Sequence, residues 1–319
     1  MDDYSQRLLV VRLSALGDVA ILEPVLRMRA AANPEVLFLL AAPPRLEPLF
    51  AHIPNVQYVP TQKRQSSKQL YRQLSALEPT QVADMHHVNR VIGCDWLFML
   101  HGVKVRCIRK HSGPDRPSWK RYDEVFERCG LKSTTPSLST LSRVYWQPKQ
   151  ATEGLPLVGI APFAQHEGKI WPIGRMEALV GRLSESGLCE VLLFGSKEEA
   201  EVMRPWAAKY ERVACLAGTM TFAEELQQIG RLNVMVSMDS SNMHFASCLG
   251  VPVVSIWGAT HAGRGFYGWR QEPSWRVEAD MGCRPCSKYG NKPCRKGDYP
   301  CMKAVTVEQV YEKVTSLLH

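Results

Sequence analysis

The chain carries an early apolar run that leads into a short turn, Leu8-Leu9-Val10-Val11-Arg12-Leu13-Ser14-Ala15-Leu16-Gly17-Asp18. This pattern predicts a buried strand that passes directly into a helix. The same pattern recurs where the apolar run Val234–Met238 precedes Asp239-Ser240-Ser241-Asn242-Met243-His244. Ligands of doubly wound sheets bind at the carboxyl ends of the strands, and helix starts there attract phosphate. We therefore expect these turns to be corners of one anion-binding active site, with Gly168-Lys169-Ile170-Trp171-Pro172 as a third corner.

Apolar runs alternate with amphipathic stretches along the chain, which predicts parallel βαβ units. Strands are expected at residues 8–12, 36–42, 56–60, 81–86, 105–109, 157–161, 189–195, 213–216, 234–238 and 251–257. Helices are expected near 18–32, 45–52, 66–77, 91–100, 119–130, 174–186, 197–210, 221–231, 240–249 and 306–318. Residues 132–154 are rich in Ser, Thr, Gln and Pro and are predicted to be a linker. The sequence thus predicts two doubly wound α/β domains, residues 1–150 and 151–319, whose strand ends face a cleft.

The excess positive charge lies in the first half of the 319 residues. Residues 1–150 contain 21 Lys and Arg against 13 Asp and Glu, whereas residues 151–319 contain 18 of each kind. The basic residues of the first half can form a surface that is simply solvated. Alternatively, this surface can attract a phosphorylated or carboxylated glycan or an anionic membrane surface. Nucleic acid is disfavoured because no binding motif accompanies the charge. The candidate acceptor-binding residues are Lys63, Arg64, Arg116, Lys120 and Arg121.

The first residues, Met-Asp-Asp-Tyr-Ser, lack the basic and apolar regions of a signal peptide. No apolar stretch approaches the roughly 18 residues that are needed to span a bilayer. These features predict a cytoplasmic protein, with peripheral contact at the inner membrane as an option.

Ten cysteines in a cytoplasmic chain argue against a disulfide framework. Six of them are scattered and are expected to be small buried residues. The other four form the pattern Cys283-x2-Cys286-x7-Cys294-x6-Cys301. This spacing fits a structural zinc site, but reduced thiols in a packed loop and a redox or disulfide role stay open as alternatives.

Two ionisable residues are candidates for the chemistry. Asp18 could accept a proton from an attacking hydroxyl, or it could be an ordinary helix cap. Lys169 could place a positive charge beside a leaving diphosphate, although lone loop lysines are commonly surface residues. Gly17 would allow close backbone approach, and His166 could either join Lys169 or be exposed.

The remaining candidates are donor contacts in the second half of the chain. Ser240 and Ser241 can donate hydrogen bonds to phosphate, and the backbone N–H groups of Ser241 and Asn242 lie in a first helical turn. Asp239 suits sugar hydroxyls or orients the turn, and His244 could face the ligand or pack in the core. Nucleotides are commonly held by a carboxylate that binds the two ribose hydroxyls, and Glu198 or Glu199 is expected to fill this role. The alternative is structural, because acids in a first helical turn are also favoured by the helix dipole.

Together these motifs resemble glycosyltransferase family 9, the ADP-heptose:lipopolysaccharide heptosyltransferases. The Ser-x-x-Gly-Asp, Lys-x-Trp-Pro and Asp-Ser/Thr-Gly-x-x-His motifs match residues 14–18, 169–172 and 239–244, with Ser241 where glycine is usual. Residues 250–254 and 257–260 also fit the family pattern, whereas the cysteine-rich tail is not a general family feature. The resemblance covers nearly the whole chain.

The resemblance implies the glycosyltransferase-B fold and inversion at the sugar carbon without a required metal. It implies that Asp18 is the catalytic base, that Lys169 binds phosphate, and that Asp239 and His244 contact the donor. The first domain would bind an acidic lipid-linked glycan such as the lipopolysaccharide inner core, and the second would bind the nucleotide-sugar. The alternatives are a transferase or epimerase with another nucleotide-sugar, and a non-catalytic binding module.

Overall fold

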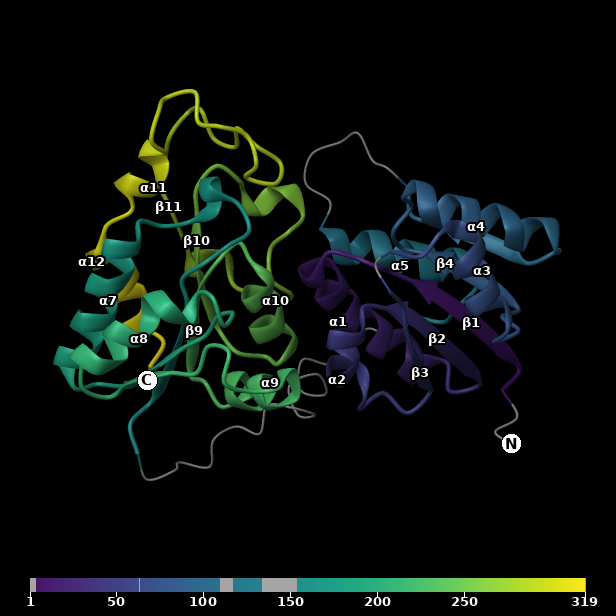
Figure 1. The fold of residues 1–319 in the computed structure, drawn as a ribbon, viewed down its shortest axis with the longest axis horizontal. Helices are drawn as coiled ribbons and strands as arrows, with labels where there is room; N and C mark the ends of the chain where they lie inside the picture. The colour runs from purple at the N-terminus through teal and green to yellow at the C-terminus, as the bar shows by residue number, and fades with distance from the viewer. Residues whose placement is uncertain (1–3, 63, 110–116, 134–153, 319) are drawn as a thin grey trace. The chain divides into compact units, whose positions relative to one another are not determined.

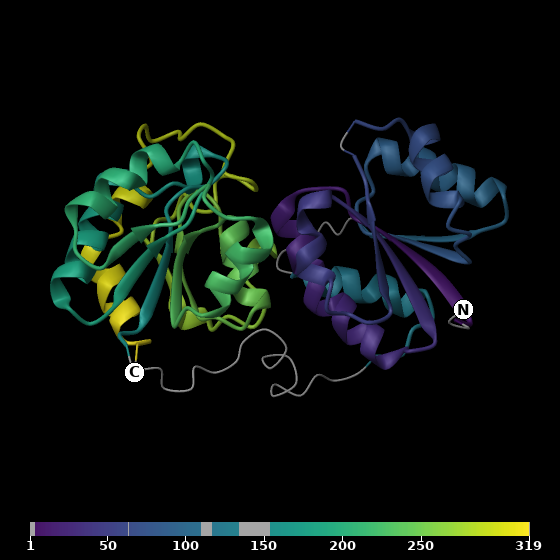
Figure 2. The ribbon, with the colours of Figure 1, turned by 60° about the horizontal axis from the view of Figure 1, so that its bottom comes forward.

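The computed structural model describes residues 4–62, 64–109, 117–133 and 154–318. The chain forms two compact units, residues 1–141 and 142–319. Each unit is a parallel β-sheet with helices on both faces (Figures 1 and 2). The predicted α/β class with two doubly wound sheets is confirmed.

The first unit contains a five-stranded sheet in the order β3-β2-β1-β4-β5. Its strands are β1 (Gln6–Val11), β2 (Val36–Ala42), β3 (Val56–Pro60), β4 (Gln81–Asp84) and β5 (Lys104–Cys107). Its helices are α1 (Leu16–Ala32), α2 (Glu47–Phe50), α3 (Ser67–Ser75), α4 (Asn89–Leu100) and α5 (Ser118–Arg128). Helices α1 and α5 pack together on one face, and α3 and α4 pack together on the other (Figure 2).

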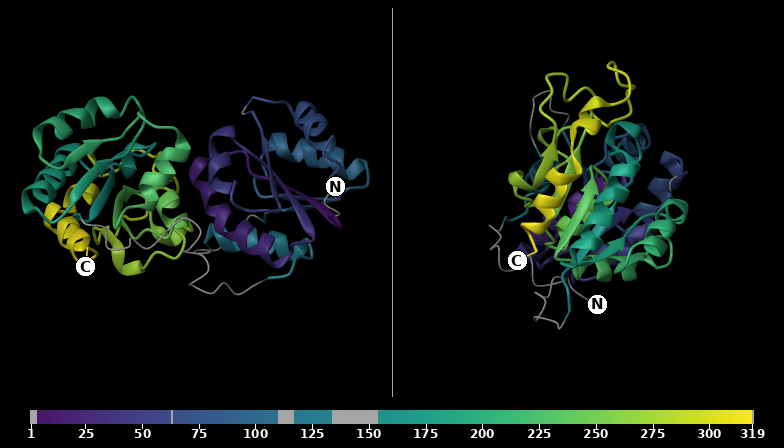
Figure 3. Two further views of the ribbon diagram at one scale, coloured as in Figure 1. Left: turned by 90° about the horizontal axis from the view of Figure 1, so that it is seen from below. Right: turned by 90° about the vertical axis from the view of Figure 1, so that its left-hand side faces the viewer.

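The second unit contains a six-stranded sheet in the order β11-β10-β9-β6-β7-β8. Its strands are β6 (Leu157–Ala161), β7 (Glu190–Leu193), β8 (Val213–Cys215), β9 (Val234–Met238), β10 (Val253–Trp257) and β11 (Arg276–Glu278). Its helices are α7 (Ile173–Ser186), α8 (Ala200–Lys209), α9 (Phe222–Gly230), α10 (Ser241–Cys248), α11 (Pro300–Ala304) and α12 (Val307–Thr315). The cysteine-rich tail and α11 follow β11, and α12 then packs along α7 (Figures 1 and 3).

The central strands of both sheets are buried on both faces. Leu8, Leu9 and Val10 of β1 are fully buried, and every residue of β6, β9 and β10 is buried. Continuous apolar runs are typical of parallel strands that are covered by helices on both sides. This explains why the apolar runs of the sequence located the strands correctly.

Strand order reverses once in each sheet. In the first sheet the chain steps from β1 outward to β3 and then resumes with β4 on the other side of β1. In the second sheet it steps from β6 outward to β8 and resumes with β9 on the other side of β6. The loops after β1 and β4, and those after β6 and β9, therefore diverge at a switch point, which is where such sheets bind ligands.

A few elements differ from the expectations. The helix expected to begin near 197 begins at Ala200, because Ser196 and Glu199 form a hydrogen-bonded turn before it. Strand β11 and helix α11 were not expected, because segments of three and five residues carry too little periodicity to be detected. Within the ranges described above, no helix has the length and apolar character needed to cross a membrane.

Candidate functional site

In the first unit, the loops after β1 and β4 are joined by hydrogen bonds at the switch point. Arg12 donates to the backbone oxygen of Met85 at 2.7 Å, and Ser14 Oγ lies 3.1 Å from His86 Nε2. The second arm of the Arg12 guanidinium forms an ion pair with Asp18 Oδ2 at 2.5 Å. Arg12 therefore fixes the position of the Asp18 carboxylate relative to the β4 loop.

Asp18 lies inside the first turn of α1 and does not cap it. The helix begins at Leu16, two residues earlier than expected, and its N-cap residue Ala15 makes no side-chain hydrogen bond. A carboxylate in a first turn is favoured by the helix dipole. The Asp18 side chain retains 23% of its exposure despite the ion pair, so it remains accessible to a hydroxyl group. Gly17 is part of the same turn.

His86 is a neutral hydrogen-bonding group at physiological pH. Partial burial, and secondly the positive charge of Arg12, lower the pKa of His86 to about 4. A neutral imidazole has one donor and one acceptor nitrogen, so it can exchange a hydrogen bond with Ser14 in either direction. His86 and Arg12 thus hold the turn that leads to Asp18, and neither residue was singled out from the sequence. Each is the last residue of a predicted strand, 8–12 and 81–86, and a polar side chain at the end of an apolar run is the signal that could have identified them.

In the second unit, the loops after β6 and β9 meet through an ion pair. Lys169 Nζ lies 2.8 Å from Asp239 Oδ2 and 3.2 Å from the Asp239 backbone oxygen. The side chains are 15% and 4% exposed, respectively. The two loops are neighbours because β6 and β9 are paired in parallel, so their carboxyl ends adjoin. The structure therefore brings together the second and third corners predicted from the sequence.

Trp171 anchors the Lys169 loop to the core. Its side chain is fully buried, its indole N–H donates to the backbone oxygen of Val305 at 3.1 Å, and its backbone N–H contacts Met238 Sδ at 3.3 Å. The Lys-x-Trp-Pro pattern thus combines one charged residue at the sheet edge with one large apolar residue that holds it there.

The start of α10 offers backbone N–H groups beside this ion pair. Ser240 is the N-cap residue, and its Oγ lies 3.1 Å from Ser237 Oγ, so the side chain does not cap the helix. Ser241 and Asn242 follow in the first turn, whose N–H groups have no partner within a helix. His244 is 5% exposed and lies on the same helix. This arrangement can accept an anion.

The acids proposed for the ribose have different environments. Glu199 accepts a hydrogen bond from the Ser196 backbone N–H at 2.7 Å and so stabilises its own turn. Glu198 is exposed, and hydrogen bonds from its own backbone N–H and from Ser196 lower its pKa. Its role as a ribose ligand stays a prediction.

The basic residues expected to bind the acceptor lie in part within the described structure. Arg64 and Lys120 are exposed, and Lys120 Nζ lies 5.4 Å from the centre of the Trp119 ring. Arg121 donates to the backbone oxygen of Arg109 at 3.3 Å. Lys63 and Arg116 fall outside the described residues.

The cysteine-rich tail packs directly against the Lys169 loop. The Ala259 N–H donates to the Gly168 oxygen at 2.9 Å, and the Ala259 oxygen accepts from the N–H groups of Cys286 and Ser287, each at 3.1 Å. Gly290 adopts a positive φ of 78°, and a Cβ atom there would lie 2.6 Å from Lys169 Cγ. The stem of Lys169 therefore lies against Gly290.

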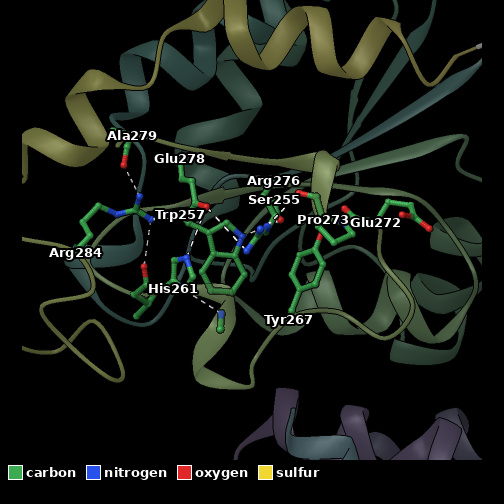
Figure 4. A network of polar contacts seen from close by, with 12 residues as sticks. Ser255, Trp257, His261, Tyr267, Glu272, Pro273, Arg276, Glu278, Ala279 and Arg284 are labelled. Atoms are coloured by element: carbon green, nitrogen blue, oxygen red, sulfur yellow. Dashed lines mark hydrogen bonds and ion pairs between the residues drawn. The ribbon is translucent and has the colours of Figure 1, made fainter. Parts of the chain in front are cut away.

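Arg284 ties the tail to the loop after β10 (Figure 4). It donates to the Gly258 oxygen at 2.6 Å and forms an ion pair with Glu278 at 2.8 Å. Arg284 also donates to the backbone oxygens of Ala279 and Thr260. This network fixes the segment that brings Gly290 to Lys169.

The four tail cysteines are free thiols of unequal exposure. Cys301 is buried, Cys283 and Cys294 are half-buried, and Cys286 is exposed. Throughout the described part of the chain, one group of His, Cys, Asp or Glu side chains has all its ligand atoms within 4.8 Å of one another, and the tail cysteines are not that group. The zinc site predicted for the tail stays a prediction. Of the scattered cysteines, Cys107 and Cys215 are half-buried rather than buried.

The chain is similar to proteins that transfer heptose. Residues 85–295 match the family model described as glycosyltransferase family 9 (heptosyltransferase), a range that includes Lys169 and Asp239. The chain is 31% identical over 121 residues to lipopolysaccharide heptosyltransferase 1 of Pseudomonas aeruginosa, and 29% identical over 135 residues to lipopolysaccharide heptosyltransferase 3 of Escherichia coli. These segments cover 38% and 41% of the chain, and they span only 33% and 40% of the two curated relatives.

A solved structure shares the fold over almost the full length. The E. coli ADP-heptose lipopolysaccharide heptosyltransferase II matches with a TM-score of 0.69, covering 98% of each chain at 20% sequence identity. This match supports the two-sheet architecture of the glycosyltransferase-B type.

The contact between Gly290 and Lys169 yields a prediction. Gly290→Ala places a methyl group against the Lys169 stem and forces a positive φ on alanine, which costs about 1 kcal/mol. We expect a lower melting temperature and displacement of Lys169, measured as weaker binding of a nucleoside diphosphate by calorimetry. Gly297→Ala is the matched control, because Gly297 has a φ of 87° but open space around its Cβ position. Equal weakening of binding by both variants would contradict a specific contact with Lys169.

Proposed function

The chain belongs to glycosyltransferase family 9, and from this premise we propose that it is an inverting glycosyltransferase that uses a nucleotide-sugar donor. The observation that carries the proposal is the Lys169–Asp239 ion pair beside the start of α10. A lysine and a helix N-terminus together suit a diphosphate, because both present positive charge and hydrogen-bond donors. The diphosphate is the leaving group of sugar transfer, so this end of the second sheet is assigned to the donor.

The proposed reaction divides the work between the two candidate sites. Asp18 accepts the proton of the acceptor hydroxyl, whose oxygen attacks the anomeric carbon from the face opposite the diphosphate. The bond between the anomeric carbon and the diphosphate breaks, and its electrons remain on the phosphate oxygen. The configuration at the anomeric carbon is inverted. Lys169 and the N–H groups of Ser241 and Asn242 stabilise the charge that develops on this oxygen. No metal ion is needed for these steps.

Arg12 has a defined part in this scheme. It engages one oxygen of Asp18, and a carboxylate has acceptor capacity beyond one such pair. Arg12 would therefore orient the base while leaving room for the acceptor hydroxyl. Asp239, once the donor is bound, would share Lys169 with the phosphates or accept hydrogen bonds from the sugar. His244 and Glu198 are proposed as further donor contacts, the latter to the ribose hydroxyls.

ADP-heptose is the proposed donor, because the E. coli structural neighbour carries ADP-heptose in its name. The proposed acceptor is an acidic lipid-linked glycan such as the lipopolysaccharide inner core, which the names of the curated relatives and the basic first half support. Such an acceptor would bring the protein to the inner surface of the membrane.

One alternative function is that of a transferase or epimerase with a different nucleotide-sugar, and binding of UDP in preference to ADP would favour it. The second alternative is a non-catalytic binding module, which predicts no sugar transfer from any nucleotide-sugar.

Asp18→Asn tests the proposed base. Turnover should fall by about 10²–10⁴-fold, because asparagine cannot accept the proton, while ADP affinity should be unchanged. Asp123→Asn is a matched control, since Asp123 also pairs with an arginine, Arg29, at 2.7 Å and its side chain has a similar exposure of 22%. Near-normal turnover of Asp18→Asn, or an equal loss in the control, would remove Asp18 from the mechanism.

Lys169→Ala tests the diphosphate site. Removing the charge should raise the Kd for ADP about tenfold or more, since ion pairs to phosphate in partly buried sites contribute more than about 1.4 kcal/mol. Isothermal calorimetry with ADP and UDP measures this effect and the donor base together. Lys209→Ala is the control, because Lys209 pairs with Glu177 at the same 2.8 Å on an exposed surface. Unchanged ADP affinity in Lys169→Ala would sink the assignment, and equal weak binding of both nucleotides by the natural protein would count against ADP.

The double variant Arg64→Glu/Lys68→Glu tests the acceptor surface, because both side chains are exposed in the basic first half. We expect a several-fold increase in the acceptor KM with no change in donor affinity, and a similar weakening on adding salt, which screens exposed charges within about 8–10 Å. The control is Arg204→Glu/Arg231→Glu, which reverses two exposed arginines of the second unit. If both double variants have the same acceptor KM as the natural protein, the basic surface is only solvated.

A further inference from the structure

Four potential metal ligands of three chemical types converge in the first unit. They are the carboxylates of Asp84 and Asp95, the imidazole of His87 and the thiol of Cys107, and one ligand atom from each lies within 4.8 Å of every other. In the portion of the chain that the structure describes, this is the one such group. None of the four residues takes part in the proposed transfer reaction.

The fold places these side chains together for simple geometric reasons. Asp84 ends β4 and Cys107 ends β5, and the two residues are directly paired in the parallel register. Paired residues of adjacent strands project to the same face of a sheet. Helix α4 supplies Asp95, and His87 lies in the loop between β4 and α4. His87 has a positive φ of 50°, which turns the chain so that Nδ1 lies 3.3 Å from Asp84 Oδ2.

Both carboxyl groups of the cluster are buried, and they differ in their hydrogen-bond partners. Asp84 is fully buried and Asp95 is 3% exposed. Asp84 Oδ1 accepts the backbone N–H groups of His86 and His87, each at 2.8 Å. Asp95 Oδ1 is buried and has no hydrogen-bond partner, and its other oxygen meets the Cys107 thiol at 3.7 Å. A buried ionised carboxylate is normally paired with a cation or coordinates a metal, so a metal ion held by these four side chains would compensate the charge of the two carboxylates.

We propose that Asp84, His87, Asp95 and Cys107 form a zinc-binding site. Zinc is bound tetrahedrally by thiolate, imidazole and carboxylate ligands at about 2.0–2.3 Å, which corresponds to separations of about 3.3–3.8 Å between ligand atoms. The separations of 3.3 Å between His87 and Asp84 and of 3.7 Å between Cys107 and Asp95 fall in this range. Calcium and magnesium require six or more oxygen ligands and do not suit this donor set. The His87 side chain is 31% exposed, which leaves an entry path for the ion.

The site would be structural, and it adjoins the loop that carries Asp18. Asp84 holds the backbone of His86 through Oδ1, and His86 contacts Ser14. Met85, between Asp84 and His86, accepts the hydrogen bond of Arg12. A zinc ion on Oδ2 would therefore help to hold this turn in place through Asp84. Metal binding by these residues does not depend on the proposed transfer reaction.

Metal analysis of the purified full-length protein tests the proposal. Zinc content is compared between the natural chain, Cys107→Ala, Asp95→Asn and the control Cys94→Ala, which removes a neighbouring buried thiol outside the group. We expect Cys107→Ala and Asp95→Asn each to lose about one zinc per chain relative to the control. Equal zinc content in all four proteins would assign the metal elsewhere, including the tail, and would overturn the proposal.

Cobalt substitution gives a second readout that does not depend on retaining zinc during purification. The metal-stripped chain in which all four tail cysteines are replaced by serine, titrated with cobalt, should develop a thiolate-to-cobalt charge-transfer band, because Cys107 is retained. In this tail-free background the band should be retained on adding Cys94→Ala and lost on adding Cys107→Ala. If no band forms in the natural protein and no zinc co-purifies, these residues do not bind metal and the proposal is overturned. Asp95→Asn, which is nearly isosteric, covers the case in which Cys107→Ala does not fold.

Discussion

The ion pair between Lys169 and Asp239 exists because strand order reverses between β6 and β9. Strands β6 and β9 are adjacent and parallel, so their carboxyl ends lie side by side at one edge of the sheet. The two loops leave this edge in opposite directions, and charged side chains from both loops can meet where the loops begin. The residues are 70 positions apart in the chain, and only the parallel pairing of β6 with β9 brings them to 2.8 Å. The start of α10 follows Asp239 directly, so the same reversal also places helix N–H groups at this edge.

The pair depends in turn on two kinds of support. Trp171 is buried in the core next to Lys169, the loop after β10 is joined to Gly168 through Ala259, and Gly290 of the tail lies against the Lys169 stem. Arg284 connects this tail to the loop after β10. A long lysine side chain loses much conformational entropy when it is held in one position, so contacts along its stem matter for its placement. The cysteine-rich segment therefore has a role in positioning Lys169 whether or not its thiols bind a metal.

In the first unit a reversal of strand order also brings two loops together, but different residues join them. The reversal between β1 and β4 joins their loops through Arg12 and His86, and Arg12 holds the carboxylate of Asp18. Asp84, the last residue of β4, is shared between this loop and the group that contains Cys107. A buried carboxylate with two oxygens can serve two neighbours at once, which couples the proposed zinc site to the turn that carries the proposed base.

The sequence by itself determined the fold class, the position of every described strand except β11, and the three loops that carry charged residues, because buried parallel strands appear as continuous apolar runs whatever lies beside them. It also identified Lys169 and Asp239 as candidates, since each lies in a turn after such a run. Only the tertiary structure decided their partners: the ion pair of Asp18 with Arg12, the contact of Gly290 with Lys169, and the meeting of Asp95 with Cys107. Local patterns report burial along one element, whereas these contacts depend on strand order, which is set by packing between distant segments.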